Sequence, residues 1–371
     1  MQFGIYSIGD RTPDARTGHR PTDRQRIKGI TAVAGKAEEI GLDVFAIGEH
    51  HTDGYSASSP AALLAHVAAN TERLLLSTAA TLLTTNDPVR IAEEYATVQH
   101  LADGRLDVML GRGISGRVYP WFGREIADSR DLAVENYELL RRLWREDKVT
   151  WSGRFRAQLD DFTSTPRPLG GVPPFVWHAV TRSTEGVDMA ARYGDGLFAN
   201  NIFWPPEHTR RLVDHYRARC AESGVGQAVV GLGGQAFIRH RSQDAVAEFR
   251  PYFDAAPVYG GGPSLEEYQR STPLVVGSPQ QVIDRVLGFR EIAGDYQRQM
   301  FLIDHAGLPL KVVLEQLDLL GEHVVPVLRA ETSGVAGPPA HPACAPAPPS
   351  PSDPTAHPVC TGVGAPVAPG R

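Results

Sequence analysis

The sequence predicts an α/β fold, a (β/α)8 TIM barrel with insertion segments. Three observations lead to this prediction: strand-like apolar runs alternate with helical segments over residues 1–330, eight such units follow one another, and several runs end in ionisable residues. Apolar runs of this kind are typical of parallel strands that are buried on both faces. Because the carboxyl ends of barrel strands meet on one face, the residues there are expected to form an active site.

The strands are recognised as short apolar runs that stop at glycine or at polar residues. The third run is apolar almost throughout, as a strand covered on both faces should be. In order along the chain, the predicted strands cover residues 2–7, 44–48, 74–83, 106–110, 175–180, 196–200, 229–238 and 300–304.

The helices are recognised by their start and stop signals. Thr22 and Gln25 form a capping-box pattern, Gly41 follows the end of the same helix, and Pro88 stands at a first-turn position. The predicted helices cover residues 22–40 and 60–70, a segment that starts at 88, and residues 130–144, 183–193, 207–223, 279–292 and 310–328.

Two insertions interrupt the alternation. Residues 148–174 carry several prolines and residues about 250–276 carry a run of three glycines before Pro263, so both are predicted to be irregular. They are expected to cover the pocket as lids. The aromatic residues that they would supply to it are Trp151, Phe155, Phe162 and Tyr259.

The end of the chain differs from the rest. Residues 331–371 are rich in proline and alanine and lack apolar periodicity. Such a segment cannot bury enough apolar surface to form a core. It is predicted to be a disordered tail that follows a barrel domain of residues 1–330.

Composition narrows the possible classes of protein. The 371 residues carry a net charge of −6, which gives no reason to expect nucleic acid or a membrane as a partner. No apolar run approaches the roughly 18–20 residues of a membrane span, and the N-terminus lacks the features of a signal peptide. Of three cysteines only Cys220 lies in the predicted barrel, so a disulfide framework is excluded there and a cytoplasmic location is expected.

The polar residues at the strand ends are the candidates for catalysis and binding. The strongest group is Glu49-His50-His51, directly after the second strand. Residues at or near the ends of other predicted strands are Ala79, Ala80, Thr81, Arg112, His178, Thr181, Arg182, Ser183, Thr184, Asn200, Asn201, Asp304 and His305. Several polar clusters at several strand ends indicate one catalytic face.

Arg112 and Ser183 have two interpretations. Ser183 and Thr184 open a predicted helix, and helix N-termini bind anions through free N–H groups. An arginine from a neighbouring unit would complete a phosphate site. The simpler interpretation from the local pattern alone is that Ser183 only caps the helix.

Two other motifs were weighed. Residues 111–116 match G-x-G-x-x-G, but no clear helix follows and the motif comes after the fourth strand, so a dinucleotide fingerprint is rejected. Glu49 and His51, completed by Asp53 or by Asp304-His305, are a poorly spaced candidate for a metal site. A metal-dependent barrel hydrolase therefore stays as an alternative.

The sequence from residue 1 to about 329 resembles the bacterial luciferase-like flavin-dependent monooxygenases. The order and spacing of several short segments make the resemblance specific. These segments are MQFGIYS, EEIGLDVFAIGEHH, LLLSTAATLLTTNDPVRIAEEYATVQHLADGRLDVMLGRG, AARYGDGLFA, VGSPQQVIDRV and HAGLPLKVVLEQLDLLGEHVVPVLR.

The resemblance implies a role for His50 and its neighbours. His50 takes the place of the family's catalytic histidine, and Glu49 or Asp304 is expected to fix its tautomer. Ala79 and Ala80 fall where the family has a peptide, often cis, under the flavin ring.

The resemblance also implies a phosphate site. Arg112, Arg130 and Ser183 fall on the positions that bind the flavin phosphate, with Thr184 as a further contact. This favours the phosphate interpretation over the simple cap.

The implied function is that of an FMN-dependent monooxygenase. It would use reduced FMN and O2 to oxygenate a small-molecule substrate through a C4a-(hydro)peroxyflavin. Because no NAD(P) fingerprint is present, a separate flavin reductase is expected to supply reduced FMN, and the family suggests a homodimer. The alternatives are an F420-dependent oxidoreductase that transfers hydride, the metal-dependent hydrolase, and a non-catalytic flavin carrier or partner subunit.

Overall fold

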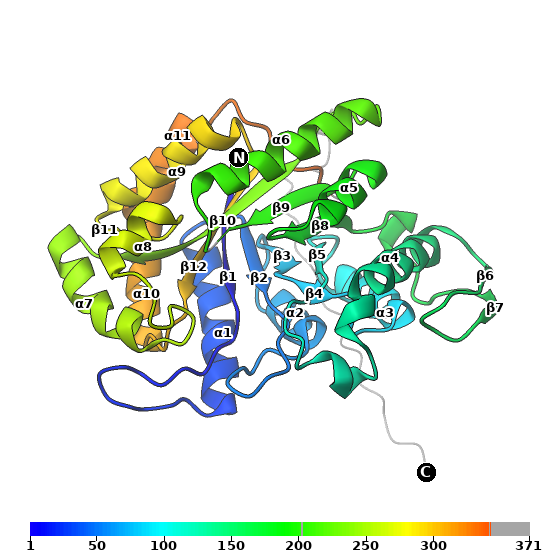
Figure 1. Ribbon diagram of the computed structural model, residues 1–371, viewed down its shortest axis with the longest axis horizontal. Helices are drawn as coiled ribbons and strands as arrows, with labels where there is room; N and C mark the ends of the chain where they lie inside the picture. The colour runs from blue at the N-terminus through cyan, green and yellow to red at the C-terminus, as the bar shows by residue number, and fades with distance from the viewer. Residues whose placement is uncertain (202, 341, 343–371) are drawn as a thin grey trace, which may run out of the picture.

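Parallel strands form the centre of the molecule and helices surround them (Figure 1). The structure, a computed structural model, describes residues 1–201, 203–340 and 342. The barrel strands are β1 (Gln2–Ser7), β2 (Val44–Ile47), β3 (Leu75–Thr78), β4 (Thr81–Leu82), β5 (Asp107–Gly111), β8 (Phe175–Val180), β9 (Gly196–Asn200), β10 (Val230–Ile238) and β12 (Arg298–Asp304). Their order in the sheet is β3-β2-β1-β12-β10-β9-β8-β5-β4.

The sheet is nearly closed into a barrel. Leu76 of β3 forms a parallel bridge to Leu106, directly before β5, and its N–H donates to the Arg105 carbonyl oxygen at 3.0 Å. At the opposite side β1 lies between β2 and β12, parallel to both. The predicted TIM-barrel-like fold is therefore confirmed.

The third predicted strand, residues 74–83, is divided into β3 and β4. β3 pairs with β2, where Leu75 lies opposite Val44, whereas β4 pairs with β5, where Thr81 lies opposite Leu110. The peptide between Ala79 and Ala80, which separates the two strands, is cis. The uninterrupted apolar pattern predicts one strand because periodicity does not show that the chain changes its hydrogen-bonding partner.

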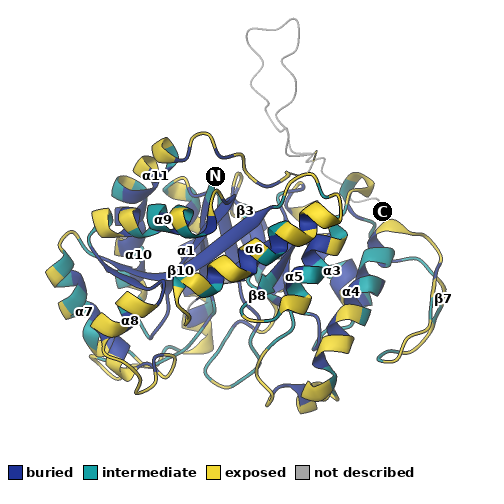
Figure 2. Cartoon of the chain, turned by 45° about the horizontal axis from the view of Figure 1, so that its top comes forward, coloured by how far each residue is buried: buried dark blue, intermediate teal, exposed yellow. Residues whose placement is uncertain are grey.

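The helices lie outside the barrel with their buried faces toward the sheet (Figure 2). Those that follow barrel strands are α1 (Asp23–Glu39), α2 (Pro60–Ala68), α3 (Pro88–Leu101), α4 (Ser129–Arg145), α5 (Thr184–Tyr193), α6 (Pro206–Glu222), α9 (Pro279–Ala293) and α10 (Leu310–Leu319). The capping box that begins α1 is present, with the Thr22 hydroxyl accepting from the Gln25 N–H at 3.2 Å. Among the described residues, no helix is both long and apolar enough to cross a lipid bilayer.

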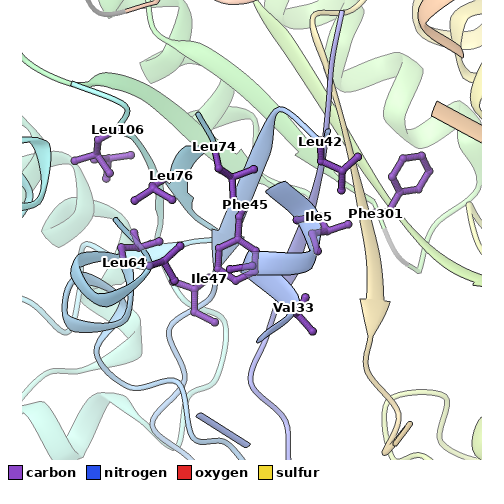
Figure 3. Close-up of a cluster of buried hydrophobic side chains, with 14 of the residues drawn as sticks. Ile5, Val33, Leu42, Phe45, Ile47, Leu64, Leu74, Leu76, Leu106 and Phe301 are labelled. Atoms are coloured by element: carbon purple, nitrogen blue, oxygen red, sulfur yellow. The ribbon is translucent and has the colours of Figure 1, made fainter. Parts of the chain in front are cut away.

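The main core lies between the helices and the sheet. Figure 3 shows Ile5, Phe45, Ile47 and Leu76 of the strands beside Val33 and Leu64 of the helices; all six are fully or almost fully buried. A second set of side chains fills the barrel interior, because alternate strand residues point to opposite faces. Its members include Tyr6, Val44, Ala46, Met109, Trp177, Phe198, Met300 and Leu302.

Both predicted insertions contain regular structure. The first forms an antiparallel hairpin of β6 (Val149–Trp151) and β7 (Leu159–Phe162). The second region contains α7 (Ser242–Ala255), α8 (Leu265–Ser271) and β11 (Val275–Gly277). The glycines predict an irregular segment correctly only between α7 and α8, where Gly260 and Gly261 have positive φ angles of 26° and 64°.

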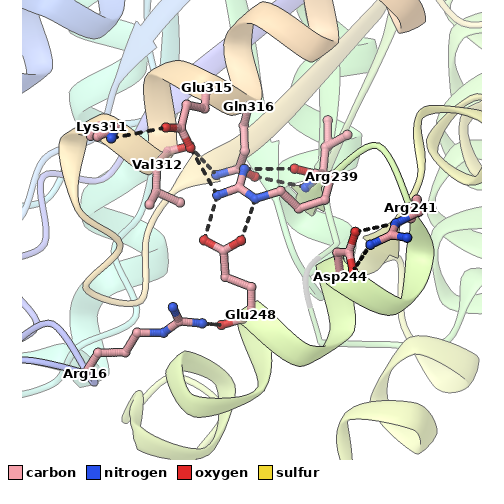
Figure 4. A network of polar contacts seen from close by, with 10 residues as sticks. Arg16, Arg239, Arg241, Asp244, Glu248, Lys311, Val312, Glu315 and Gln316 are labelled. Carbon is pink, nitrogen blue, oxygen red and sulfur yellow. Dashed lines mark hydrogen bonds and ion pairs between the residues drawn. The ribbon is translucent and has the colours of Figure 1, made fainter.

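Charged side chains attach α7 to the barrel (Figure 4). Arg239, directly after β10, donates to the Glu248 carboxylate of α7 from Nε at 2.6 Å and from Nη2 at 2.7 Å. Arg239 also lies 3.5 Å from the Glu315 carboxylate of α10. From the other side, Arg16 donates to the Glu248 carbonyl oxygen at 3.2 Å.

The predicted closing helix, residues 310–328, is interrupted. α10 passes through a π-helical turn, Leu320–Val324, into α11 (Val325–Glu331). Pro326 accounts for the interruption, because proline has no N–H and its ring displaces the preceding turn. Beyond α11 the chain still packs on the barrel, and the Val335 carbonyl oxygen accepts from the N-terminal amine at 2.6 Å. Most of the predicted tail, residue 341 and residues 343–371, lies outside the described residues.

Candidate active site

A cavity of about 480 Å³ opens at the carboxyl ends of β2, β4, β5 and β8. This volume is in the range of small-molecule and cofactor sites. Seven of the eight predicted site residues line it: Glu49, His50, Ala79, Ala80, Arg112, Arg130 and Ser183. Thr184, the first residue of α5, is not among the lining residues and is exposed.

His50 lies in the wall of the cavity, three residues after the end of β2 at Ile47. Its ring stacks on Tyr55, with 4.2 Å between the ring centroids and 17° between the planes. A side chain at Gly48 would bring a Cβ within 3.1 Å of the Ala79 carbonyl oxygen and 3.5 Å of His50 Nε2. Burial lowers the pKa of His50 from 6.5 to about 4. The imidazole is therefore neutral at pH 7, with one nitrogen able to donate and the other to accept.

Glu49 holds the loop together instead of orienting His50. Its buried carboxylate accepts from the Leu82 N–H at 3.0 Å, from Asn86 Nδ2 at 2.8 Å, and from the Thr85 hydroxyl at 3.1 Å. It also contacts His51 Nε2 at 2.7 Å. Among the described residues, the hydrogen bonds of Glu49 go to these groups and none joins it to His50.

The expectation that Glu49 or Asp304 fixes the His50 tautomer is therefore wrong. Asp304 is engaged elsewhere, because its carboxylate accepts from Arg26 at 2.8 Å and from the Ser7 hydroxyl at 2.5 Å. Residues that are adjacent in the sequence at the end of a strand point to different faces, so Glu49 and His50 need not contact each other.

Small residues form one part of the cavity wall. The cis peptide Ala79–Ala80 lies beside Gly111 at the end of β5, where an added Cβ would stand 3.2 Å from the Ala80 Cβ. Gly111 and the two alanines line the cavity together. These positions therefore present only backbone and Cβ atoms to the cavity.

Two arginines and a serine lie close to the point where α4 and α5 begin. The Arg112 guanidinium donates to the Ser129 hydroxyl at 2.7 Å, and Arg130 lies 2.7 Å from the Glu185 carboxylate. The Ser183 hydroxyl caps α5 by accepting from the Gly186 N–H at 3.4 Å. Hydrogen bonding to its own backbone N–H, and then to Ser183, lowers the pKa of Glu185 below its usual value. The cap interpretation and the anion interpretation of Ser183 are thus compatible.

Several lining residues are absent from the sequence prediction. Tyr6 of β1 lines the cavity, and its buried hydroxyl has no hydrogen-bond partner within the described part of the chain. Tyr55 and Glu185 line it as well. The strand alternation could have indicated Tyr6, and the position of Glu185 in the first turn of α5 could have indicated an acid beside Ser183.

The predicted lids do not reach the cavity. None of Trp151, Phe155, Phe162 and Tyr259 is among its lining residues. The residues after β5 take that place, with Ile114 and Val118 in the lining, and Phe122 packs edge-on against His51 at 4.7 Å. The prediction of the lids was wrong because it assumed that the two irregular insertions cover the cavity. The loop directly after β5 lines the cavity instead.

The structure gives the metal-site alternative no support. Among the described residues, no three His, Cys, Asp or Glu side chains converge in a way that could hold a metal ion. Asp53 instead lies near Arg11 and Arg20, at 3.5 and 3.4 Å, and its side chain is 85% exposed.

The sequence is similar to known monooxygenases over most of its length. The family model of the luciferase-like monooxygenases matches residues 1–296. The 4-hydroxyprotoasukamycin monooxygenase of Streptomyces nodosus subsp. asukaensis is 30% identical over 327 residues, covering 80% of this chain and 86% of that protein. The oxygenase component of the flavin-dependent trigonelline monooxygenase of Acinetobacter baylyi is 22% identical over 353 residues, covering 88% and 95%.

Solved structures share the fold at low sequence identity. The monooxygenase RslO1 of Streptomyces bottropensis has a TM-score of 0.78 at 24% identity, covering 88% of this chain and 99% of that one. The oxygenating constituent of 3,6-diketocamphane monooxygenase of Pseudomonas putida, in complex with FMN, has a TM-score of 0.73 at 17% identity, covering 91% and 99%. An F420-dependent secondary alcohol dehydrogenase has a TM-score of 0.70 at 17% identity, covering 88% and 99%.

This chain belongs to the luciferase-like monooxygenase family.

Proposed function

We propose that this member of the luciferase-like monooxygenase family is a flavin-dependent monooxygenase that uses reduced FMN and O2 to oxygenate a small organic molecule. One observation carries the proposal: two arginines beside a helix N-terminus, a wall of small residues and a neutral histidine line the same cavity. These are the three things that a phosphorylated planar cofactor and its proton chemistry require.

The residues of the cavity fit FMN. Arg112, Arg130 and Ser183 would hold its phosphate, because two guanidinium groups and a helix N-terminus favour an anion. The Ala79–Ala80 wall and Gly111 would contact the ring system. The position of the Glu185 carboxylate, 2.7 Å from Arg130 at the start of α5, supports this fit because an anionic group already lies there. Reduced FMN, when bound, supplies the electrons and the activation of dioxygen.

His50 is the proposed catalytic residue. Because burial lowers its pKa to about 4, it acts as a neutral imidazole at pH 7, donating a hydrogen bond from one ring nitrogen and accepting one at the other. Glu49 is better described as a positioning residue, since its carboxylate holds Leu82, Asn86 and His51 around the cavity. Apolar lining residues such as Leu82, Val118 and Met189 would exclude water from the site.

A separate flavin reductase is part of the proposal. The trigonelline enzyme is described as an oxygenase component, which supports a two-component arrangement. A homodimer and a cytoplasmic location stay predictions, which light scattering and cell fractionation would test.

Oxygen uptake tests the proposed reaction. The purified protein is supplied with enzymatically reduced FMN and a panel of small organic molecules, and oxygen consumption and product mass are followed. We expect at least one compound to give a product heavier by one oxygen atom, labelled when 18O2 is used. Oxygen uptake at the free-flavin rate with every compound would count against an oxygenase.

An F420-dependent hydride transfer is the second candidate. The F420-dependent glucose-6-phosphate dehydrogenase of Kineococcus radiotolerans is 33% identical over 201 residues, half of this chain. Titration of the protein with FMN and with F420, each followed by absorbance and fluorescence, separates the two proposals. Tighter binding of F420, with substrate oxidation that needs no oxygen, would favour the second.

A further inference from the structure

Glu185 occupies the place where the cofactor phosphate is proposed to bind. Its carboxylate lies 2.7 Å from Arg130 Nη1, and its own N–H and then the Ser183 hydroxyl contribute to lowering its pKa. These are groups that a phosphate would use at the start of α5. The Arg112 guanidinium acts on the same carboxylate, because its positive charge contributes to lowering the pKa of Glu185.

The carboxylate and a phosphate cannot both take these contacts. Two anions in contact with one helix N-terminus repel each other, and each donor would have to be shared. The side chain of Glu185 is 47% exposed and that of Arg130 is 63% exposed, so Glu185 can turn outward into water without unfolding α5. An ion pair this exposed is weak, at about 0–1 kcal/mol.

We infer that Glu185 is an internal competitor for the proposed phosphate site: it pairs with Arg130 when the cofactor is away and must leave that arginine when the phosphate enters. The inference rests on the proposed flavin function. Glu185 therefore lowers the affinity for phosphorylated flavin and reduces the preference of the protein for FMN over riboflavin. If a reductase supplies the reduced flavin, the flavin has to leave the site in every catalytic cycle. A carboxylate that competes for the phosphate contacts favours this release.

The alternative is that Glu185 only stabilises the start of α5. Negative side chains in the first turn of a helix interact favourably with its dipole. In that case removal of the charge would lower the stability of the protein and would leave the affinity for the two flavins unchanged or weaker for both. Binding of FMN measured against binding of riboflavin separates the two roles, because only FMN carries the phosphate.

Glu185→Gln is the test variant and Glu94→Gln is its matched control. Glu94 on α3 is also an exposed acid at 2.8 Å from an arginine, Arg90, and it does not line the cavity. Each substitution removes one negative charge. The parent and both variants are titrated at low ionic strength with FMN and with riboflavin, in the oxidised and the reduced state, and the dissociation constants are taken from flavin fluorescence and absorbance.

For Glu185→Gln we expect a dissociation constant for FMN about fivefold lower than that of the parent, the value that corresponds to about 1 kcal/mol. The riboflavin constant of this variant and both constants of Glu94→Gln should stay within about twofold of the parent, as for surface charges away from a ligand. FMN binding that is unchanged or weaker in Glu185→Gln, or a gain of equal size for both flavins, would overturn the inference and leave the proposed function intact. If the parent binds neither flavin in either redox state, the proposed function fails, and the inference with it.

Discussion

The two halves of the barrel mouth carry similar polar residues and use them in opposite ways. The open half, formed by Glu49, His50, Arg112, Arg130 and Ser183, surrounds the cavity and leaves ring nitrogens and guanidinium groups able to contact a ligand. The sealed half consists of Ser7, Asp10, Arg26, Asp304 and His305, which contact one another or nearby aromatic residues.

In the sealed half the partners are internal. Arg26 donates to Asp304 at 2.8 Å and to the Ser7 hydroxyl at 3.1 Å, and it lies 3.7 Å from the Asp10 carboxylate. His305 is covered by Tyr259, whose hydroxyl contacts its Nε2 at 2.7 Å. Residues of the open half also have partners, such as Ser129 for Arg112 and Glu185 for Arg130, but they line the cavity. A polar residue at the end of a barrel strand therefore indicates function more strongly when it also lines a cavity.

Substitution of Arg26 should disrupt the ion pairs of the sealed half and cause the largest loss of stability. Arg26→Met leaves the buried Asp304 carboxylate without its cation, which should lower the free energy of unfolding by about 3–5 kcal/mol. Urea denaturation at pH 7 measures it. Arg90→Met, which removes an exposed pair on α3, is the control and should change the same quantity by less than about 1 kcal/mol. A loss of equal size in both variants would mean that the buried cluster contributes no more than a surface pair.

Substitutions of His50 and of His305 should have different effects on turnover. His50→Ala is expected to slow turnover about a hundredfold, which is the lower range for loss of a general acid or base. Flavin affinity should stay close to that of the parent, because the phosphate contacts are untouched. His305→Gln is the control, since His305 lies in the sealed half, and it should leave turnover unchanged. Steady-state oxygen uptake and flavin titration measure the two effects, and normal turnover in His50→Ala would remove His50 from the mechanism.

Substitution of Arg112 should weaken the open half without unfolding the protein. Arg112→Ala removes one of the charged donors proposed to hold the phosphate, so FMN affinity should fall by about 1.5–3 kcal/mol, or roughly ten- to 150-fold. Riboflavin, which has no phosphate, should bind as it does to the parent. Arg124→Ala is the control, because Arg124 donates to the Phe155 carbonyl oxygen and does not line the cavity. An equal loss for both flavins would place the effect outside the phosphate contact.

Acid should destabilise the sealed half through His305. Burial lowers its pKa from 6.5 to about 4, so between these values the unfolded chain binds more protons than the folded one. Stability from this residue is present above pH 6.5 and is lost as the pH falls toward 4. At pH 5.5 the loss should be about 1.4 kcal/mol relative to neutral pH.

Comparison with His305→Gln isolates this contribution. The pKa of Asp10 is raised by burial and shifts stability in the opposite direction, but that group is present in both proteins. The variant should therefore lose less stability than the parent between pH 7.5 and pH 5.5 in urea denaturation. Parallel pH profiles would contradict the buried neutral state of His305.

Much of the fold could be predicted because its signals are local. Apolar runs marked the barrel strands, and the capping box at Thr22 and the proline at 88 marked two helix starts that the structure confirms. Where the signals are ambiguous, the prediction failed: the apolar run 74–83 did not reveal the change of partner at Ala79–Ala80, and proline-rich or glycine-rich segments did not reveal α7, α8 or the β6–β7 hairpin.

The sequence by itself determined which residues stand at the ends of the strands, because alternation and position in the chain depend on neighbours a few residues away. Only the tertiary structure decided which of them line the cavity. Arg26 and Asp304 are separated by 278 positions and neutralise each other, whereas Glu185, two positions from Ser183, takes the contacts of Arg130. Whether a polar group meets a partner or a ligand depends on groups brought together from distant parts of the chain, and no local pattern contains that information.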